Sequence, residues 1–451
     1  MEEKNEKKDN ELVYPEGGYG WVIVFAIILL NISLLTLIYC FGIIFRDEFN
    51  DMGITAAKTS FLLHLQISLF CVVGFFGSPL LKRYSYRKVA CAGATIWCSG
   101  IFLTSFANSY ALLIVTISIM TGVGQGILMP ATYLATNSYF KKRLTLAVSI
   151  STTGASIFSI FSPKLCHLLV TNLGRKYTVL TLFSISLLSF IGCFLLKPLP
   201  PAQKSEEDLV KLNHLNQQAT PDNETSVQTY SETTRPKPKT ETVISKLINL
   251  FDLSLLKQLS YSVAVLALSV SYAAELNVIV MLQFILPELA QFDGNDVANV
   301  TSVQFVFDII GRLVIPMVCH YFNASPKWIY IGALIAASVA RTLLAWYYQY
   351  YTVVYVAVCI FGVTKGLRAV YQSVIVPKLV PLDKYATANG FQMFFTGAIS
   401  LVIGPVIGII HDTWKSYVPA LHTASILSCC CVVLWVNETI FNRKKPDRTE
   451  S

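Results

Sequence analysis

Charged residues are scarce in this sequence. Asp, Glu, Lys and Arg make up only 14% of its 451 residues, while 54% are hydrophobic. A soluble globular domain carries about 25% charged residues, so the composition excludes an ordinary water-soluble protein. The net charge of +8 would suggest nucleic acid in a soluble chain, but the basic residues here fall between apolar runs, where they set membrane topology. No nucleic-acid partner is expected.

The residue groupings of enzymes are missing as well. The sequence contains no phosphate-binding glycine–lysine loop, no nucleophile grouped with a base and no cluster of metal ligands. Its 11 cysteines are scattered, mostly in apolar runs, and show no C-x-x-C spacing, which argues against a disulfide framework or a metal site. A cleaved signal peptide is not expected, because residues 1–11 are hydrophilic. We therefore expect no enzyme activity, no cofactor and no metal.

Long apolar runs dominate what is present. A helix needs about 20 apolar residues to cross the hydrocarbon core of a bilayer, and the chain contains twelve runs of this kind. We predict an all-α membrane protein with twelve transmembrane helices. The expected spans are Tyr19–Phe45, Ser60–Leu81, Val89–Ala107, Tyr110–Thr136, Leu144–Val170, Thr178–Leu196, Lys257–Leu286, Val297–Tyr321, Trp328–Tyr348, Thr352–Pro377, Ala386–His411 and Tyr417–Phe441.

The spans form two groups of six, separated by a polar stretch. This layout is expected of the major facilitator fold, in which two six-helix halves enclose a site near the middle of the membrane. The predicted division is a tail at 1–18, a first half at 19–198, a linker at 199–256, a second half at 257–441 and a tail at 442–451. Because the linker is rich in polar residues and poor in aromatics, we predict that most of it is disordered.

The basic residues also predict an orientation. Lys and Arg gather in the cytoplasmic loops of membrane proteins. With both termini in the cytosol, the inner loops and tails hold seventeen Lys and Arg before the linker is counted, and the outer loops hold five. Those five are Arg46, Lys58, Arg175, Lys176 and Lys415. A multi-pass protein with both termini cytosolic is therefore predicted.

One predicted span carries both an acidic and a basic residue. Asp308 and Arg312 are four residues apart within 297–321, a spacing that makes them neighbours on a helix. A charge at the bilayer centre costs about 2.5–3.5 kcal/mol on insertion scales, so we expect these residues to have a structural or functional role. They form either an ion pair that only fixes helix packing or part of a substrate and proton pathway, and the residues alone leave both open.

Several motifs narrow the function. The first span opens with an acidic-Gly-Gly-aromatic-Gly-Trp sequence, and the fifth opens with a Tyr-Phe-x-Lys-basic run followed by Leu-Ala and small residues. In this order along the chain, the motifs resemble those of the monocarboxylate transporter family of the major facilitator superfamily. The residues that carry them are Glu16, Gly17, Gly18, Tyr19, Gly20 and Trp21 in the first motif, and Tyr139, Phe140, Lys142, Arg143 and Gly154 in the second.

The resemblance implies roles for the charged pair. Asp308 would be the proton-responsive carboxylate, and Arg312 would hold the substrate carboxylate with its planar, bidentate fork. The resemblance also implies a place in the plasma membrane. The family's better-known members travel with a single-span immunoglobulin-type glycoprotein, which becomes a candidate partner on this ground only.

One position departs from the family pattern. The family's proton-linked lactate and pyruvate carriers have a lysine in the first span, where this chain has Tyr39. In the tenth span, Lys365 and Arg368 share a helix face. They either replace the missing substrate-facing charge or pair with Glu275 of the seventh span as structural ions. Glu275 and Asn277 are polar residues within that span and fit either a pathway or a packing role.

Two more basic residues, Lys164 and Arg341, lie toward the outer ends of their spans, and we expect both side chains to reach the headgroups. Together these features predict a secondary transporter that moves a small organic anion, such as a monocarboxylate, by alternating access, with or without proton coupling. The alternatives are a facilitative carrier of an aromatic amino acid, hormone-like acid or other amphipathic metabolite without proton coupling, and a solute sensor that transports nothing.

Overall fold

The structure is a computed structural model of the chain that describes residues 17–140, 143–197, 253–322, 324–380 and 384–443. Most of the predicted linker and tails lies outside these residues. Every element within them is a helix, as the apolar runs predict. The first group comprises α1 (Tyr19–Tyr39), α2 (Phe41–Asp51), α3 (Ala56–Phe75), α4 (Gly77–Arg83), α5 (Tyr86–Thr104), α6 (Tyr110–Leu113), the π-helix η1 (Ile114–Met120), α7 (Thr121–Tyr139), α8 (Leu144–Ser186) and α9 (Leu188–Leu195).

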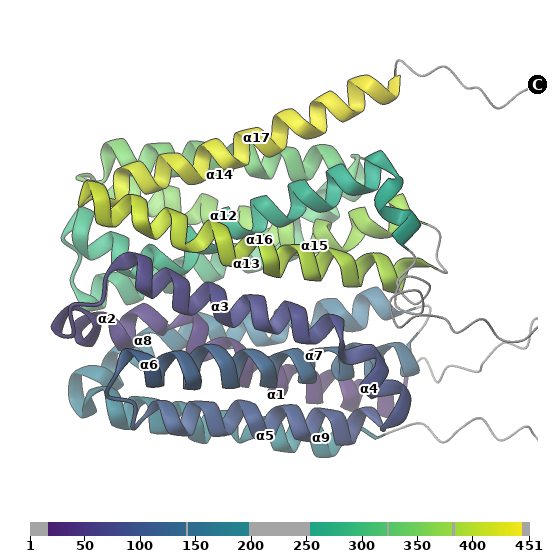
Figure 1. Cartoon of the computed structure of the whole chain (residues 1–451), viewed down its shortest axis with the longest axis horizontal. Helices are drawn as coiled ribbons and strands as arrows, with labels where there is room; N and C mark the ends of the chain where they lie inside the picture. The colour runs from purple at the N-terminus through teal and green to yellow at the C-terminus, as the bar shows by residue number, and fades with distance from the viewer. Residues whose placement is uncertain (1–16, 141–142, 198–252, 323, 381–383, 444–451) are drawn as a thin grey trace, which may run out of the picture.

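The second group follows the linker. It comprises the short 3-10 helix η2 (Leu253–Lys257), α12 (Leu259–Ala290), α13 (Gly294–Tyr321), α14 (Pro326–Tyr347), α15 (Tyr351–Leu379), α16 (Tyr385–Trp414) and α17 (Tyr417–Arg443). Figure 1 shows both groups as bundles of roughly parallel and antiparallel helices.

Ten helical stretches among the described residues are long and apolar enough to cross a membrane. One of them, Leu146–Leu195, has 50 residues, and its helix is interrupted at Gly174, where φ is 74°. A left-handed φ suits glycine and breaks a right-handed helix, so this stretch supplies the fifth and sixth predicted spans. The third predicted span is α5, which packs against α7. The described helices therefore correspond in position to the twelve predicted spans, although α5 is not among the ten stretches.

The first span differs from its prediction. It was expected as one helix over Tyr19–Phe45, but the helix is interrupted at Cys40. The α1 helix ends at Tyr39, and α2 continues from Phe41 to Asp51. The residue at the interruption is a cysteine rather than a glycine or a proline, and it lies inside a strongly apolar run.

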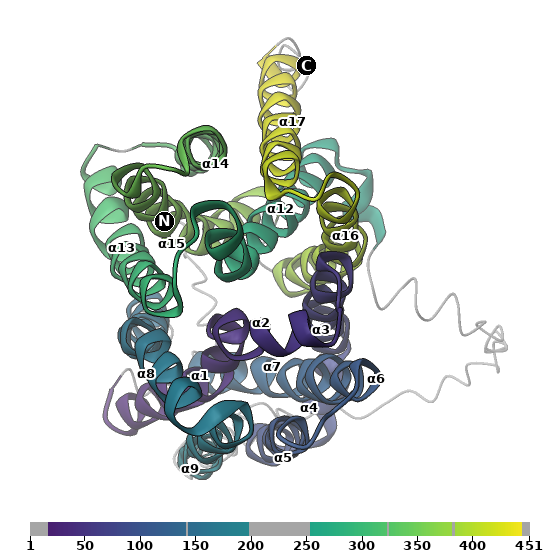
Figure 2. The same cartoon turned by 90° about the vertical axis from the view of Figure 1, so that its left-hand side faces the viewer.

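The two groups of helices meet at several places in the part of the chain that the structure describes. The α3 helix packs against α16, α8 packs against α13, and α2 touches α12. Seen from one end of the bundle, the purple-to-blue first group and the green-to-yellow second group lie on opposite sides of a common seam (Figure 2). The seam between the two groups is where a transporter of this architecture places its site.

The two ends of the bundle are distinct, and we name them by their residues. The near end holds the start of α1 and the end of α9, since the Tyr19 hydroxyl donates to the Leu195 carbonyl at 3.0 Å. The far end holds the turn between α2 and α3. There the Asp412 carboxylate of α16 accepts hydrogen bonds from the backbone N–H groups of Ala56 and Ala57, both at 3.0 Å.

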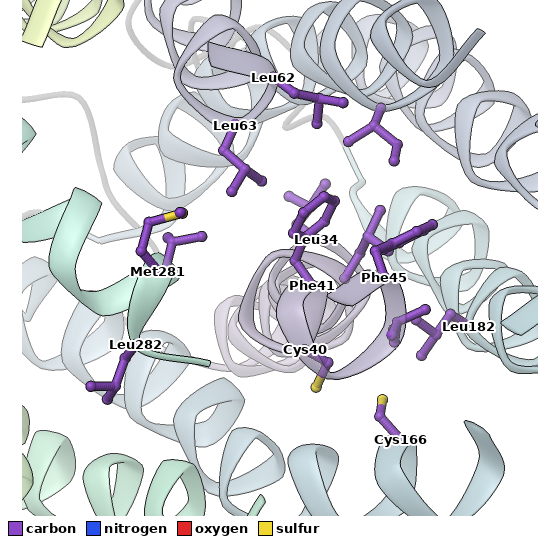
Figure 3. Packing of buried hydrophobic residues seen from close by; sticks show 14 of the residues in the cluster. Leu34, Cys40, Phe41, Phe45, Leu62, Leu63, Cys166, Leu182, Met281 and Leu282 are labelled. Atoms are coloured by element: carbon purple, nitrogen blue, oxygen red, sulfur yellow. The ribbon is translucent and has the colours of Figure 1, made fainter. Parts of the chain in front are cut away.

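An apolar cluster closes the first group toward the far end. In Figure 3, Phe41 and Phe45 of α2 pack with Leu34 of α1 and Leu63 of α3, and Met281 of α12 faces the same cluster from the second group. The Phe41 and Phe45 rings stack with their centres 4.9 Å apart. This packing joins the short helix α2 to both halves.

Candidate functional site

The centre of the site is the ion pair predicted on α13. Arg312 Nε donates to Asp308 Oδ1 at 3.1 Å, one helical turn away. The Asp308 side chain is 1% exposed and that of Arg312 is 16% exposed, so the acid lies deeper in the protein than the base. The spacing of the two residues along the helix accounts for their contact.

A second cation approaches Asp308 from α15. The Lys365 ammonium lies 3.8 Å from Asp308 Oδ2, within ion-pair range but too far for a hydrogen bond. Two glycines permit the close approach of these helices. A Cβ on Gly366 would lie 2.3 Å from the Asp308 carbonyl oxygen, and one on Gly311 would lie 2.3 Å from that of Val363. The carboxylate thus faces a cation on its own helix and another on the neighbouring helix.

Two aromatic rings surround the Lys365 ammonium. It lies 4.2 Å from the centre of the Tyr39 ring of α1 and 4.4 Å from that of Phe305 on α13. These distances are those of cation–π contacts. Its Nζ atom is buried and has no hydrogen-bond partner among the described residues. The position at which the family pattern expects a lysine is therefore occupied by Tyr39, with the ammonium of Lys365 against its ring.

The neighbouring cation, Arg368, has a different environment. It forms an ion pair with Glu275 of α12 and donates from Nη1 to the Ser271 carbonyl at 3.1 Å. Both charged side chains are almost fully buried. The ion-pair geometry expected of Arg368 and Glu275 is present, whereas Lys365 turns toward Asp308 and Tyr39. The two cations of the tenth span thus have separate partners.

Asn277 lies in a polar network that joins the two halves. Its Nδ2 lies 2.9 Å from Ser60 Oγ and 3.2 Å from His64 Nε2, both on α3. The other ring nitrogen of His64 is 2.8 Å from Ser400 Oγ on α16. Since the donors and acceptors are buried and satisfied by one another, Asn277 contributes to the contact between halves rather than to the group around Asp308.

Arg341 corrects one prediction. Its side chain was expected to reach the headgroups, but it is 1% exposed and lies between α14 and α17. There it donates to the hydroxyls of Ser338, Ser425 and Ser428 at 3.1, 3.3 and 2.7 Å, respectively. The serines replace water around the guanidinium, and spacing along one helix could not show this. Lys164 is exposed on α8.

The two family motifs meet at the near end, although more than 100 residues separate them in the sequence. The Trp21 ring packs edge-on against Phe140 at 5.4 Å, and a Cβ on Gly20 would lie 2.7 Å from the same ring. Tyr139 donates to the Lys197 carbonyl at 2.9 Å.

The other motif residues are placed as follows. Gly154 packs against Ile28 of α1, and Gly18 adopts a φ of 55° before α1 begins. Gly17 precedes that turn, and Arg143 precedes α8 on the surface. Glu16 and Lys142 lie outside the described residues. Gly20, Trp21, Tyr139, Phe140 and Gly154 thus belong to contacts between helices rather than to the group around Asp308.

Three of the residues that shape the seam give little sign of this role in the sequence. Phe305, His64 and Gln283 lie in apolar spans, where a polar or aromatic side chain gives only a weak signal. His64 and Gln283 could have been noted as polar residues at membrane depth, which are rare and costly. Their partners lie on helices that are distant in the sequence.

The family model described as Major Facilitator Superfamily matches residues 21–269 and 250–451. A Rattus norvegicus protein named Monocarboxylate transporter 10 is 24% identical over 438 residues, which cover 94% of this chain and 80% of that protein. Monocarboxylate transporter 4 of Gallus gallus is 22% identical over 436 residues, covering 96% and 85%. These relatives confirm the resemblance that the motifs indicate.

Solved structures share the fold. A crystal structure of the peptide transporter POT superposes with a TM-score of 0.69 at 14% identity, covering 95% of this chain and 97% of that one. A crystal structure of the nucleoside transporter NupG gives 0.68 at 12% identity, covering 93% and 99%. At such low identities, the likeness concerns the arrangement of helices alone.

Proposed function

Because the chain belongs to the Major Facilitator Superfamily, we propose that it is a secondary transporter whose solute is a small organic anion with a carboxylate group. The relatives named monocarboxylate transporters support this solute class. The alternating-access cycle, in which two halves rock about a site at their seam, is the mode of transport that we infer from the architecture.

The observation that carries the proposal is the uneven charge around Asp308. Within the seam, Arg312, Lys365 and Arg368 provide three cations, whereas Asp308 and Glu275 provide two carboxylates. Arg368 and Glu275 neutralise each other, so the surplus positive charge lies with Arg312 and Lys365. An unmatched cation in a region of low dielectric attracts an anion strongly, and such a site selects a negatively charged solute.

Lys365 is the group that we assign to the solute carboxylate. Its ammonium has three donors, yet it has no hydrogen-bond partner among the described residues. It lies against two aromatic rings and near a carboxylate oxygen beyond hydrogen-bond distance. A bound carboxylate would supply the missing acceptors. Arg312 is one turn along α13 from Asp308 and can share the same anion, because its guanidinium can donate to two acceptors at once.

Asp308 is the group that we assign to the proton. When it is ionised, one carboxylate offsets part of the charge of Arg312 and Lys365; when it is protonated, both cations lack their counter-charge. Binding of a proton and binding of an anion therefore favour each other, and thermodynamic linkage makes this coupling reciprocal. Symport of a proton with the anion follows from this coupling.

The aromatic rings favour a second candidate solute. The ring centres of Tyr39 and Phe305 lie 4.7 Å apart, and both rings lie against the Lys365 ammonium that we assign to the solute carboxylate. A solute with an aromatic or other apolar body beside its carboxylate would pack against these rings. This supports an aromatic amino acid or a hormone-like acid as the alternative to a short monocarboxylate, carried by facilitated diffusion if Asp308 does not exchange its proton.

Orientation and location complete the proposal. The excess of basic residues at the near end supports a cytosolic position for that end and for both termini, with the far end facing outward. Contacts between halves are present at the far end, such as those of Asp412 with the start of α3, and we assign this end as the closed one. We place the protein in the plasma membrane because of its likeness to the monocarboxylate transporter family.

The test is uptake by purified protein in lipid vesicles. Short monocarboxylates, aromatic amino acids and the carboxamide of each would be offered, with and without an inward proton gradient. We expect saturable uptake of at least one carboxylate, little uptake of its amide and faster uptake with the gradient. Empty vesicles provide the background. Equal uptake of acid and amide would overturn the assignment of an anion site, and absence of any flux would favour the solute sensor.

A further inference from the structure

The break in the first span is made by a side chain from the other half of the molecule. In a continuous helix, the Ile43 N–H would donate to the Tyr39 carbonyl four residues earlier. Here Ile43 N–H donates instead to Gln283 Oε1 at 3.0 Å, and Gln283 Nε2 donates to the Tyr39 carbonyl. The carboxamide of Gln283, on α12, thus replaces one helical hydrogen bond with two bonds of its own. Insertion of a side chain into the helical ladder is a recognised cause of a kink.

The surroundings are built to admit this carboxamide. Gln283 is 4% exposed, so both ends of its amide are satisfied by the backbone of the first span rather than by water. Gly42 makes the approach possible, since a Cβ there would lie 2.6 Å from Gln283 Cβ and 2.9 Å from its Oε1. A buried amide placed in this way requires its partners, because an unpaired buried polar group is destabilising.

The same backbone groups have a second way to be satisfied. If α12 moved away from the first span, Ile43 N–H and the Tyr39 carbonyl could bond to each other, and α1 and α2 would become one helix. Gln283 would then bond to water. The contact of Asp412 at the far end lacks this property, because the N–H groups of Ala56 and Ala57 begin a helix and have no partner within it in either state.

We propose that Gln283 is a positioning residue that holds the far end closed by breaking the first span, and that the span straightens when this end opens. The proposal rests on the transport function inferred above, since it assigns two states to the helix that carries Tyr39. The segment from Tyr39 to Ile43 is the two-state element, and its two hydrogen-bond patterns compete for the same carbonyl and the same N–H.

The position of Tyr39 links this element to the solute site. Its carbonyl accepts from Gln283, while its ring lies against the Lys365 ammonium. A change in the hydrogen bonding of the Tyr39 backbone therefore moves the ring that covers the cation. The closed far end, the kinked span and the covered cation belong to one state, and the open far end, the straight span and the released ring belong to the other.

The test measures the distance between the two halves at the far end without any solute. Spin labels on ketone-bearing amino acids at Asp51 and Gln291, both exposed, avoid the native cysteines. The variant Gln283→Met keeps the length of the side chain but removes both hydrogen bonds. We expect the population with a long label distance to rise about fivefold or more, because two hydrogen bonds are lost from the closed state only. The control is Gln66→Met, which replaces a buried glutamine on α3 whose Nε2 has no partner among the described residues.

A second variant covers the case in which Gln283→Met does not fold. Gly42→Ala leaves the carboxamide intact but fills the space that it needs, and it should raise the same long-distance population. If the folded Gln283→Met and Gly42→Ala proteins both show the distance distribution of the wild type, the proposal is overturned. Because no solute is present, the label distances do not depend on the uptake assay. Failure of the uptake assay would contradict the proposed transport function, whereas unchanged label distances would contradict the role of Gln283.

Discussion

The Lys365 ammonium on α15 lies 4.2 Å from the centre of the Tyr39 ring on α1, and the two residues come from different halves of the transporter. Tyr39 occupies the position at which the family's lactate and pyruvate carriers are expected to have a lysine. The first span therefore lacks this cation, but Lys365 of the tenth span brings one to the same place. This relationship makes the positive charge of the seam depend on the contact between halves.

Replacement of Lys365 should weaken anion binding. A hydrogen bond to a charged group contributes about 1.5–3 kcal/mol, and 1.4 kcal/mol is a tenfold change in affinity, so Lys365→Met should raise the half-saturation concentration about tenfold or more. The measurement is concentration-dependent uptake in vesicles that contain equal amounts of protein. Lys164→Gln, which removes an exposed lysine of α8, is the control and should transport normally. Unchanged half-saturation in Lys365→Met would remove this residue from the site.

Replacement of Asp308 should separate transport from the proton gradient. Asparagine cannot take up or release a proton, and it leaves Arg312 and Lys365 in the charge state that they have beside a protonated aspartate. Asp308→Asn should therefore lose accumulation driven by an inward proton gradient, while exchange of labelled for unlabelled solute persists. Uptake is measured at several internal and external pH values. Gradient-driven accumulation equal to that of the wild type would show that Asp308 does not carry the proton.

Variants of Arg368 and Glu275 can show whether this ion pair stabilises the fold or takes part in transport. Removal of one partner leaves an uncompensated buried charge, which costs about 3–5 kcal/mol, so Arg368→Met should lower the thermal unfolding temperature in detergent. Removal of both charges, in Arg368→Met with Glu275→Leu, should restore most of the stability. Uptake by this stable double variant then decides the matter. Normal uptake is expected of an ion pair that fixes α12 against α15, and loss of uptake in the stable protein would place the pair in the solute pathway.

The close packing of α13 on α15 should depend on Gly366. A Cβ at this position would lie 2.3 Å from the Asp308 carbonyl oxygen, so Gly366→Ala must push the helices apart and lengthen the separation between Asp308 and Lys365. We expect destabilisation of about 1–3 kcal/mol and reduced uptake. Gly332→Ala on α14 is the matched control, because a Cβ there would meet no atom within 4 Å. The thermal unfolding temperatures of the two variants, measured side by side, should differ; equal values would contradict the packing argument.

Much of the architecture follows from the sequence because the bilayer simplifies the rules. The backbone polar groups of a segment that crosses lipid must be satisfied internally, so apolar runs of sufficient length form helices. The lengths of these runs predict the ends of most membrane helices, from α1 to α17, to within a few residues. The contact between Asp308 and Arg312 also follows from the sequence, since it depends only on the pitch of one helix.

The contacts between helices could not be predicted in the same way. In a bilayer, the outer face of a helix is as apolar as its buried face, so the pattern of hydrophobic residues does not reveal which side packs against which neighbour. Arg341 illustrates the difficulty. Its place near the end of a span suggested a side chain that reaches the headgroups, whereas the serines of α14 and α17 enclose it within the helical bundle.

The sequence by itself determined that this protein is an all-α membrane transporter with a charged pair on its eighth span. Only the tertiary structure decided that Lys365 rather than Arg368 accompanies Asp308, that Tyr39 covers this lysine and that Gln283 breaks the first span. The physical reason is distance along the chain. Gln283 lies 240 residues from Ile43, and no local preference of either segment contains the hydrogen bond that joins them.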